Sequence, residues 1–369
     1  MAIRILHTGD LHIGMTYSRY PEAVQKLLSE ARVEVLKTLV ARANEENCNL
    51  FIIAGDLFDR LRVNKSLVTK VMAILAGFGG EALLLLPGNH DYDDGTNELW
   101  RYISGNMPDN MVLLNEDKVY SLTSHNLDVD VYPAYCHRKH SATNKLAWMK
   151  ENQECDPQKI NIGVAHGAVE GLSPDMQGEY FYMTVKELEN IPVDVWLLGH
   201  AHVRYPDLEE VAGAAVFNCG TPEPDGLNFS RKGNAWLIDI SEDKKISAQS
   251  LHPGIYQFYN LNCRVESEAD FEKILRDVID ENAGQKVVRL CLHGNIDEEL
   301  MKRRNEYYQQ LEENLLYFQV DDTKLGKKIT KELIDQEFTV NSFPYRLLHR
   351  LADDDEVLQL AYELIGRAK

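Results

Sequence analysis

Five short polar segments of the 369-residue chain contain side chains that could bind metal ions. Each segment places an aspartate, an asparagine or a histidine beside a glycine: Gly9–His12, Gly55–Asp59, Gly88–Asp91, Ala165–Gly167 and Gly199–His202. Asp10 and His12 are two residues apart, as are His200 and His202, so in extended backbone both members of each pair face the same way. One such segment alone is an ordinary turn, but five in order indicate a shared metal site.

The residue types in these segments limit the metal and the reaction. Carboxylate, imidazole and amide groups without thiolates suit a divalent ion such as Mn²⁺, Fe²⁺ or Zn²⁺. The candidates are too many for one ion, and two ions about 3.5–4 Å apart would use them if one carboxylate were shared. The two ions would carry more charge than two carboxylates remove, and the excess would attract a phosphate ester and a metal-bound hydroxide, which predicts in-line hydrolysis at phosphorus. The candidate ligands are Asp10, His12, Asp56, Asn89, His166, His200 and His202.

Strands and helices alternate over the first 250 residues and would have to position these side chains. The apolar runs predict strands, and in open α/β sheets ligands collect outside the carboxyl ends of strands. The alternation favours an α/β fold whose later strands add hairpins. The predicted strands are Ile3–Thr8, Leu50–Ala54, Leu83–Leu86, Asn161–Ala165, Val193–Leu198, Ala214–Asn218 and Ala235–Ile240, and the predicted helices are Glu22–Glu46, Lys65–Phe78 and Val185–Glu189.

The pattern changes near the turn His252-Pro253-Gly254, which predicts a boundary. A smaller α/β unit should follow, with a helix near Ala269–Ile279, a strand at Val287–His293 and a helix near Glu298–Glu313. Helical periodicity then marks Pro344–Arg367. We therefore expect a metal-bearing domain over residues 1–254, a capping and DNA-binding α/β domain over 255–335, and a C-terminal helical segment over 336–369.

The five polar segments, in this order, resemble the calcineurin-like metallophosphoesterase superfamily. The long helix between the first two segments, Phe58 and the C-terminal additions make the chain similar to the SbcD-type DNA-repair exonuclease branch, the nuclease subunit that partners an SMC-like ATPase. The resemblance implies an α/β (α+β) fold with a β-sandwich core flanked by helices, whereas the strand pattern alone favours a plain parallel sheet. It also implies that the C-terminal helical segment docks on the coiled-coil base of an SbcC-type ATPase.

The resemblance assigns roles to single residues. One ion would lie between Asp10, His12, Asp56 and His202, and the other between Asp56, Asn89, His166 and His200, with Asp56 bridging. His90 would bind no metal, contact the phosphate and protonate the leaving oxygen. At Asp59, archaeal and eukaryotic relatives tend to carry a second active-site histidine, so the part that histidine plays in choosing exonuclease or endonuclease products does not carry over.

Other polar residues near these segments are weaker candidates. Asp59 and Asp91 would accept hydrogen bonds from ligands and so orient them. Arg60, Arg62 and Lys65 could contact a DNA backbone, and the clusters Arg138–His140 and Lys302–Arg304 are similar, although a short basic run is more often a solvated surface.

Composition narrows the class of protein. The chain has 39 basic and 58 acidic residues, a net charge of −19, whereas proteins that bind nucleic acid over their whole surface are normally basic. Six cysteines without a CxxC pair predict reduced thiols, and the absence of a signal peptide or a membrane-length apolar run predicts a cytoplasmic protein with no membrane role.

Three functions stay open at this stage. The first is a Mn²⁺-dependent DNA exonuclease or endonuclease acting on ends or single-stranded/double-stranded junctions, as a homodimer with an SbcC-type ATPase in a DNA-repair complex. The second is a phosphatase or phosphodiesterase that acts on a nucleotide or a phosphoprotein. The third is a non-catalytic adaptor that keeps the fold, which the complete set of candidate ligands disfavours.

Overall fold

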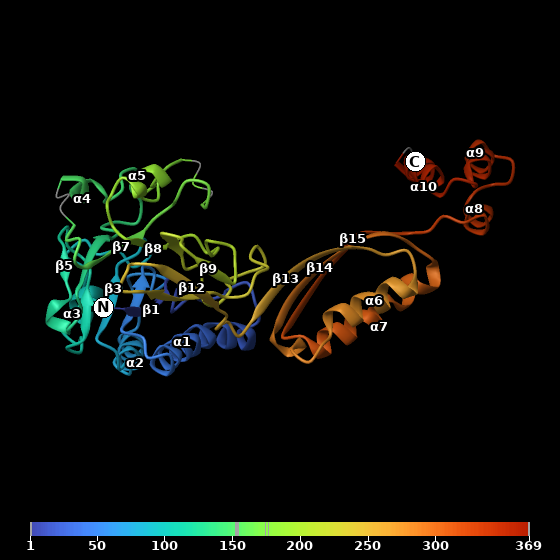
Figure 1. Cartoon of the computed structure of the whole chain (residues 1–369). Helices are drawn as coiled ribbons and strands as arrows, with labels where there is room; N and C mark the ends of the chain where they lie inside the picture. Colours follow the sequence, from blue (N-terminus) through green and yellow to red (C-terminus); the bar gives the residue numbers. More distant parts are fainter. Residues whose placement is uncertain (1, 152–154, 174, 176, 368–369) are drawn as a thin grey trace. The chain divides into compact units, whose positions relative to one another are not determined.

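The chain forms two compact units in a computed structural model that describes residues 2–151, 155–173, 175 and 177–367. The first unit comprises Met1–Asp225 with Arg231–Gln257, and the second comprises Gly226–Ser230 with Phe258–Lys369 (Figure 1). Within the described ranges, no helix combines the length and apolar character that crossing a bilayer requires. The functional division expected at residues 254 and 335 stays a prediction.

Two β-sheets form the centre of the first unit. The larger sheet has the order β4-β3-β2-β1-β11-β12-β9, with β1 to β4 parallel and β11, β12 and β9 added antiparallel. Its strands are β1 (Ile3–Thr8), β2 (Leu50–Ala54), β3 (Ala82–Leu86), β4 (Met111–Leu113), β9 (Glu210–Ala212), β11 (Ala235–Ile240) and β12 (Ile246–Leu251).

The smaller sheet has the order β10-β8-β7-β6-β5, parallel except for β5. Its strands are β5 (Tyr120–Ser121), β6 (Val129–Ala134), β7 (Ile160–His166), β8 (Val195–Gly199) and β10 (Val216–Asn218). Every strand predicted from the first 250 residues is present, within two residues at either end. Strands β4, β5, β6, β9 and β12 were not predicted.

The two sheets pack face to face, so the β-sandwich core is confirmed and the plain parallel sheet is wrong. Ile5 and Ile52 of the larger sheet share one buried cluster with Val131, Ile162 and Leu197 of the smaller sheet. Periodicity alone could not decide between the two architectures. Strands buried on both faces read as continuous apolar runs, whether a helix or a second sheet covers the second face.

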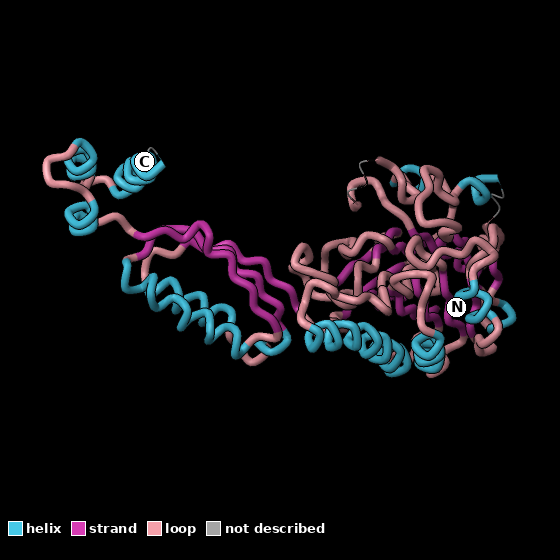
Figure 2. The backbone as a smooth tube through the Cα atoms, turned by 180° about the vertical axis from the view of Figure 1, so that it is seen from behind, coloured by secondary structure: helices cyan, strands magenta, loops and turns pink. Residues whose placement is uncertain are grey.

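Helices cover both outer faces of the sandwich (Figures 1 and 2). Leu36 and Leu39 of α1 (Glu22–Glu45) pack with Phe51 of the larger sheet, and α2 (Lys65–Leu75) and α3 (Glu98–Ser104) join the same cluster. On the smaller sheet, residues of α4 (Ala147–Glu151) and α5 (Val185–Glu189) pack against Trp196 and Leu198. A short 3-10 helix, η1 (Thr123–His125), precedes β6.

The second unit is a three-stranded sheet with two helices on one face (Figure 1). The strand order is β13 (Gln257–Arg264), β14 (Lys286–Ile296) and β15 (Tyr317–Lys327), and the helices are α6 (Glu268–Val278) and α7 (Glu298–Asn314), with η2 (Ala283–Gln285) before β14. The sequence did not predict β13 or β15. Residues 321–327 of β15 include aspartates and lysines, which a strand tolerates when its pairing with a neighbour holds it in place.

Three helices complete the second unit: α8 (Lys331–Glu337), α9 (Phe343–Leu351) and α10 (Asp355–Arg367). Ile334, Phe338, Leu348 and Leu358 form their buried centre. The predicted helical segment is therefore two helices that share a small core with α8. Several large apolar side chains of α9 and α10 are exposed, including Phe343 (75%), Leu360 (58%) and Leu364 (57%).

Candidate metal centre

The predicted ligands lie at the carboxyl ends of five strands drawn from both sheets. Asp10 and His12 follow β1, Asp56 follows β2, and Asn89 follows β3; His166 ends β7, and His200 and His202 follow β8. The parallel strands of each sheet end at the same edge, so residues up to 190 positions apart in sequence come within hydrogen-bond distance of one another. The structure brings all seven candidates into one buried or half-buried cluster.

The turns after β1 and β2 run side by side and are held by backbone hydrogen bonds. Asp10 N donates to Gly55 O at 3.0 Å and His12 N donates to Asp56 O at 2.9 Å. Asp10, His12 and Asp56 have φ of 51°, 44° and 51°, a region that non-glycine residues rarely adopt. Gly55 also has positive φ, and a Cβ there would lie 2.1 Å from His166 Nδ1. These two turns therefore need both the glycine and strained backbone to place their ligands.

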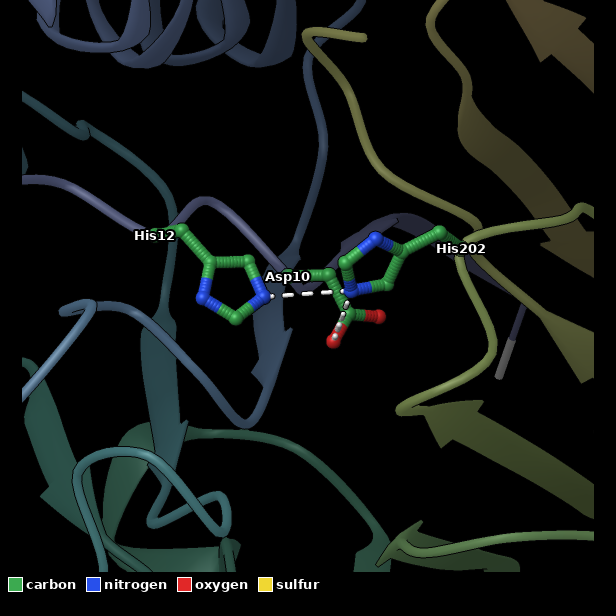
Figure 3. Close-up of side chains that lie close together, drawn as sticks. All are labelled: Asp10, His12 and His202. Atoms are coloured by element: carbon green, nitrogen blue, oxygen red, sulfur yellow. Dashed lines mark hydrogen bonds and ion pairs between the residues drawn. The ribbon is translucent and has the colours of Figure 1, made fainter. Parts of the chain in front are cut away.

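The first group of close donors is Asp10, His12 and His202 (Figure 3). The two imidazoles point toward each other with their Nε2 atoms 3.1 Å apart, and His202 Nε2 lies 3.8 Å from Asp10 Oδ1. Asp56 joins the group, since its Oδ2 lies 3.6 Å from His12 Nε2. These four residues are the set expected to hold one ion.

The second group contains Asp56, Asn89, His166 and His200. His166 Nε2 lies 3.4 Å from Asp56 Oδ2 and 3.0 Å from Asn89 Oδ1, and the same amide oxygen lies 3.0 Å from His200 Nδ1. Asp56 therefore faces both groups, and Asp10 also lies within metal-ligand distance of Asp56 and His166. The bridging role of Asp56 stays a prediction. Two carboxylates, an amide oxygen and imidazole nitrogens turned toward common points form a donor set that fits two divalent ions.

His90 lies beside both the first group and the shared carboxylate. Its backbone N donates to Asp56 Oδ1 at 2.8 Å, and its ring meets that of His12 edge-on at 4.7 Å. Its Nδ1 lies 3.0 Å from the carbonyl oxygen of Asp59; because a carbonyl only accepts, Nδ1 carries a proton and Nε2 is left for another partner. His90 also comes within metal-ligand reach of His12 and Asp56, so its role as a proton donor stays a prediction.

Several other groups form hydrogen bonds or close contacts with the candidate ligands or with their turns. The buried Asp91 carboxylate accepts from Gly88 N at 2.8 Å and from Phe58 N at 3.0 Å, which ties the second and third segments together. His166 Nδ1 donates to Ala54 O, which leaves Nε2 facing Asp56. Asp59 Oδ1 lies 3.7 Å from His12 Nδ1.

Two supporting residues were missed by the sequence analysis. Asp225 Oδ2 accepts from His202 Nδ1 at 2.6 Å, and Thr221 Oγ1 donates to Asp10 O at 2.9 Å. Both lie in the segment Thr221-Pro222-Glu223-Pro224-Asp225, which contains no glycine–aspartate or histidine pair. The only signal in the sequence was an aspartate and a threonine around two prolines, and that is typical of a loop.

Burial and mutual charge shift the pKa values of the cluster. Burial raises the pKa of Asp10 to about 6. Burial would also raise the pKa of Asp56, but the neighbouring His166, His12 and His90 hold it well below its usual range. Burial would lower the pKa of His166, yet the charge and hydrogen bond of Asp56 raise it to about 9, whereas burial lowers the pKa of His200 to about 3.

The basic candidates differ in how far their charges are already compensated. Arg60 binds the Asp59 carboxylate at 2.9 Å, whereas Arg62 and Lys65 are exposed and have no ion-pair partner within the described part of the chain. Arg62 and Lys65 line a cavity of about 680 Å³ with Tyr102 and the start of α3. Arg138 donates to His137 Nε2, while Lys302, Arg303 and Arg304 each pair with a carboxylate.

Comparison with known proteins adds a family and two curated relatives. The calcineurin-like phosphoesterase family model matches residues 3–204. The chain is 26% identical to the DNA double-strand break repair protein Mre11 of Haloferax volcanii over 294 residues, and 23% identical to the uncharacterized metallophosphoesterase YhaO of Bacillus subtilis over 214 residues. These alignments cover 79% and 55% of this chain but only 61% and 49% of the two relatives.

Two solved structures are similar at lower identity. The protein TT1561 of Thermus thermophilus aligns over 69% of this chain and 100% of its own, with 11% identity and a TM-score of 0.41. A dimetal phosphatase from Danio rerio aligns over 67% of this chain and 98% of its own, with 13% identity and a TM-score of 0.40.

Replacement of the shared carboxylate should reduce metal at both positions. Asp56→Asn keeps the shape of the side chain but removes the charge that both donor groups use, so elemental analysis of the Mn²⁺-loaded protein should find less than half of the wild-type metal. Asp239→Asn is the matched control, because that carboxylate pairs with Arg4 at the other end of β1. Wild-type metal content in Asp56→Asn would refute the bridging assignment.

Metal binding should tighten as the pH rises. At pH 7 the metal-free protein holds a proton on His166, whose pKa is about 9, while Asp10, with a pKa of about 6, is largely ionised. A metal must displace such protons, so affinity should increase from pH 6 to pH 9 and binding at pH 7 should release at least one proton. Calorimetry in buffers of different ionisation enthalpy measures that release, and its absence would contradict the His166 assignment.

Proposed function

The chain belongs to the calcineurin-like phosphoesterase family, and from that premise we propose that it is a two-metal-dependent DNA nuclease, the nuclease subunit of an SbcCD-like repair complex. The observation that carries the proposal is the buried cluster in which Asp56 faces two groups of donors, with His90 beside it. The similarity to a DNA double-strand break repair protein over 79% of the chain supports DNA as the substrate.

The chain's residues divide the work of such a reaction. Asp10, His12, Asp56 and His202 would hold one ion, and Asp56, Asn89, His166 and His200 the other. Bound there, divalent ions of which Mn²⁺ is the first candidate, with Fe²⁺ or Zn²⁺ as alternatives, would supply charge neutralisation at the phosphate and an activated water for in-line attack. Backbone hydrogen bonds between the turns after β1 and β2 hold Asp10 and His12 beside Asp56.

His90 would supply the proton for the leaving oxygen. Its Nδ1–H is held by the Asp59 carbonyl, which fixes the ring and directs Nε2 away from that loop. A proton carried on Nε2 would then be the one passed to the leaving oxygen. Asp59 thus has a role through its backbone oxygen, while its side chain pairs with Arg60 and lies near His12.

Substrate contacts must be local, because the net charge of −19 disfavours binding of DNA over the whole surface. Arg62 lies between the Asp56 turn and α2, and Lys65 is the first residue of α2; both are exposed and have no ion-pair partner in the described residues, so they are the first candidates for the DNA backbone. Arg60 would contribute once its pairing with Asp59 is exchanged for a phosphate. DNA ends and single-stranded/double-stranded junctions are the proposed substrates.

A phosphatase or phosphodiesterase acting on a nucleotide or a phosphoprotein is the second candidate. It would use the same metal centre, and the strong negative charge of the chain favours it over a protein that must bind DNA unaided. A DNA-binding partner removes that difficulty. We therefore place the SbcC-type ATPase in the proposal, with homodimerisation as a further expectation from the family resemblance.

The C-terminal helices supply the proposed surface for the ATPase. Leu360 and Leu364 lie one helical turn apart on α10, and both are more than half exposed, while Leu348 and Leu358 fill the core beneath. An exposed apolar pair on a helix suits a groove of a partner.

The substrate class can be tested with the Mn²⁺-loaded protein and two variants. Wild type should cut single-stranded or double-stranded DNA and bis-p-nitrophenyl phosphate. His90→Asn should keep both ions and lose about 10²–10⁴-fold in turnover, the usual contribution of general acid–base catalysis. Arg62→Ala combined with Lys65→Ala should weaken DNA cleavage without affecting bis-p-nitrophenyl phosphate. Hydrolysis of p-nitrophenyl phosphate alone by the wild type would instead establish a phosphatase.

The partner surface can be tested without unfolding the helices. Leu360→Glu with Leu364→Glu should abolish co-purification with the ATPase and leave cleavage of short DNA unchanged, since both side chains are exposed. Leu27→Glu on α1, where the leucine is 42% exposed, is the matched control. If the ATPase still binds the α10 double variant, the interface lies elsewhere.

A further inference from the structure

A fully buried arginine lies behind the turn that carries the first two candidate ligands. Arg32 belongs to α1 and has no exposed surface. The other buried residues of this helix are apolar, so Arg32 places a charge in an apolar region. Burying a guanidinium is costly unless hydrogen bonds and nearby negative charge compensate it. The contacts of Arg32 therefore indicate its role in the structure.

Two hydrogen bonds connect Arg32 to the segment after β1. Nη1 donates to the carbonyl oxygen of Leu11 at 2.7 Å, and Nε donates to the Tyr17 hydroxyl at 2.8 Å. The guanidinium also lies over the Tyr17 ring, 5.6 Å from its centre. Leu11 lies between Asp10 and His12, which both have positive φ, so Arg32 holds this strained turn at its middle residue.

Negative charge around Arg32 comes from the segment that supports His202. Burial raises the pKa of Glu223 to about 7, and the charge of Arg32 opposes that rise. Burial would also raise the pKa of Asp225, but the hydrogen bond and charge of His202, and then the charge of Arg32, lower it to about 2. Asp225 accepts from His202 Nδ1 at 2.6 Å. Within the described residues no carboxylate lies within ion-pair distance of Arg32, and its buried Nη2 has no hydrogen-bond partner.

These contacts converge on one of the two donor groups. Asp10 and His12 flank the carbonyl that Arg32 holds, and His202 is held by a carboxylate in the field of Arg32. Asn89, His166 and His200 make no direct contact with Arg32 among the described residues, and His200 is linked to the same turn only through its backbone N, which donates to Asp10 Oδ2 at 2.9 Å. The direct contacts of Arg32 are therefore with the turn of the group Asp10–His12–His202, and Arg32 reaches the other group only through Asp10.

We propose that Arg32 is a positioning residue for the metal ion held by Asp10, His12 and His202, which it serves by fixing the Asp10–Leu11–His12 turn against α1. This inference rests on the proposed two-metal function. It predicts an effect on one ion and not the other, which distinguishes it from a general role of Arg32 in packing α1, because general destabilisation would weaken both positions.

The test measures Mn²⁺ binding to four variants of the full chain. Arg32→Met removes the charge and both hydrogen bonds, Arg32→Lys keeps the charge, and Tyr17→Phe removes only the acceptor of Nε. Arg42→Met on the same helix is the control, since Arg42 is exposed and pairs with Glu45 and Glu46. Equilibrium dialysis gives the stoichiometry and both dissociation constants, circular dichroism reports folding, and the electron paramagnetic resonance spectrum reports whether the two Mn²⁺ ions are coupled.

Arg32→Met should bind one ion as wild type does and the other about 10–100-fold more weakly, the usual effect of removing a residue that supports a ligand. Its spectrum should change from a coupled pair to an isolated Mn²⁺, and Arg32→Lys and Tyr17→Phe should weaken the same single position to a smaller extent. Dissociation constants within about twofold of wild type in folded Arg32→Met, or equal weakening of both positions, would overturn the proposal.

If Arg32→Met does not fold, Arg32→Lys and Tyr17→Phe decide in the same way: selective weakening supports the proposal, and unchanged or equally weakened binding overturns it. Failure of the wild-type chain to bind Mn²⁺ would refute the proposed function itself. That result is distinct from equal binding by wild type and variants, which would refute only the role of Arg32.

Discussion

Two carboxylates buried among imidazoles are the constraint on which the rest of the first unit depends. Asp10 and Asp56 are 0% and 1% exposed, and each accepts a backbone N–H from another ligand-bearing turn: His200 N at 2.9 Å for Asp10 and His90 N at 2.8 Å for Asp56. Buried charges of this kind are stable only with charged or hydrogen-bonding partners, which must come from the ends of several strands. The two sheets, the strained turns and the glycines beside them together bring these partners to the two carboxylates.

The sequence predicted the part of this arrangement that is local. Apolar runs such as Leu50–Ala54 identified the strands, and the glycine–aspartate, glycine–asparagine and histidine turns after them identified all seven donors that the structure gathers. The family resemblance supplied the sandwich. Whether Ile52 is covered by a helix or by Val131 of a second sheet depends on contacts between residues far apart, which periodicity does not record.

The residues that support the donors could not be predicted from the sequence, because they too lie far along the chain from the residues they contact. Asp225 lies 23 positions from His202, and Arg32 lies 21 positions from Leu11, on a helix where one basic residue reads as a solvated side chain. β15 was missed because its aspartates and lysines interrupt the strand pattern, although pairing with β14 holds it. The donor residues could thus be predicted from short segments of sequence, whereas the residues that orient them can be identified only in the tertiary structure.

The central claim is that Asp56 bridges two divalent ions, and anomalous X-ray diffraction from crystals grown with Mn²⁺ tests it most directly. Two anomalous peaks about 3.5–4 Å apart, with an Asp56 oxygen contacting both, are the result that this account predicts. One peak would contradict it, as would two peaks that share no Asp56 contact.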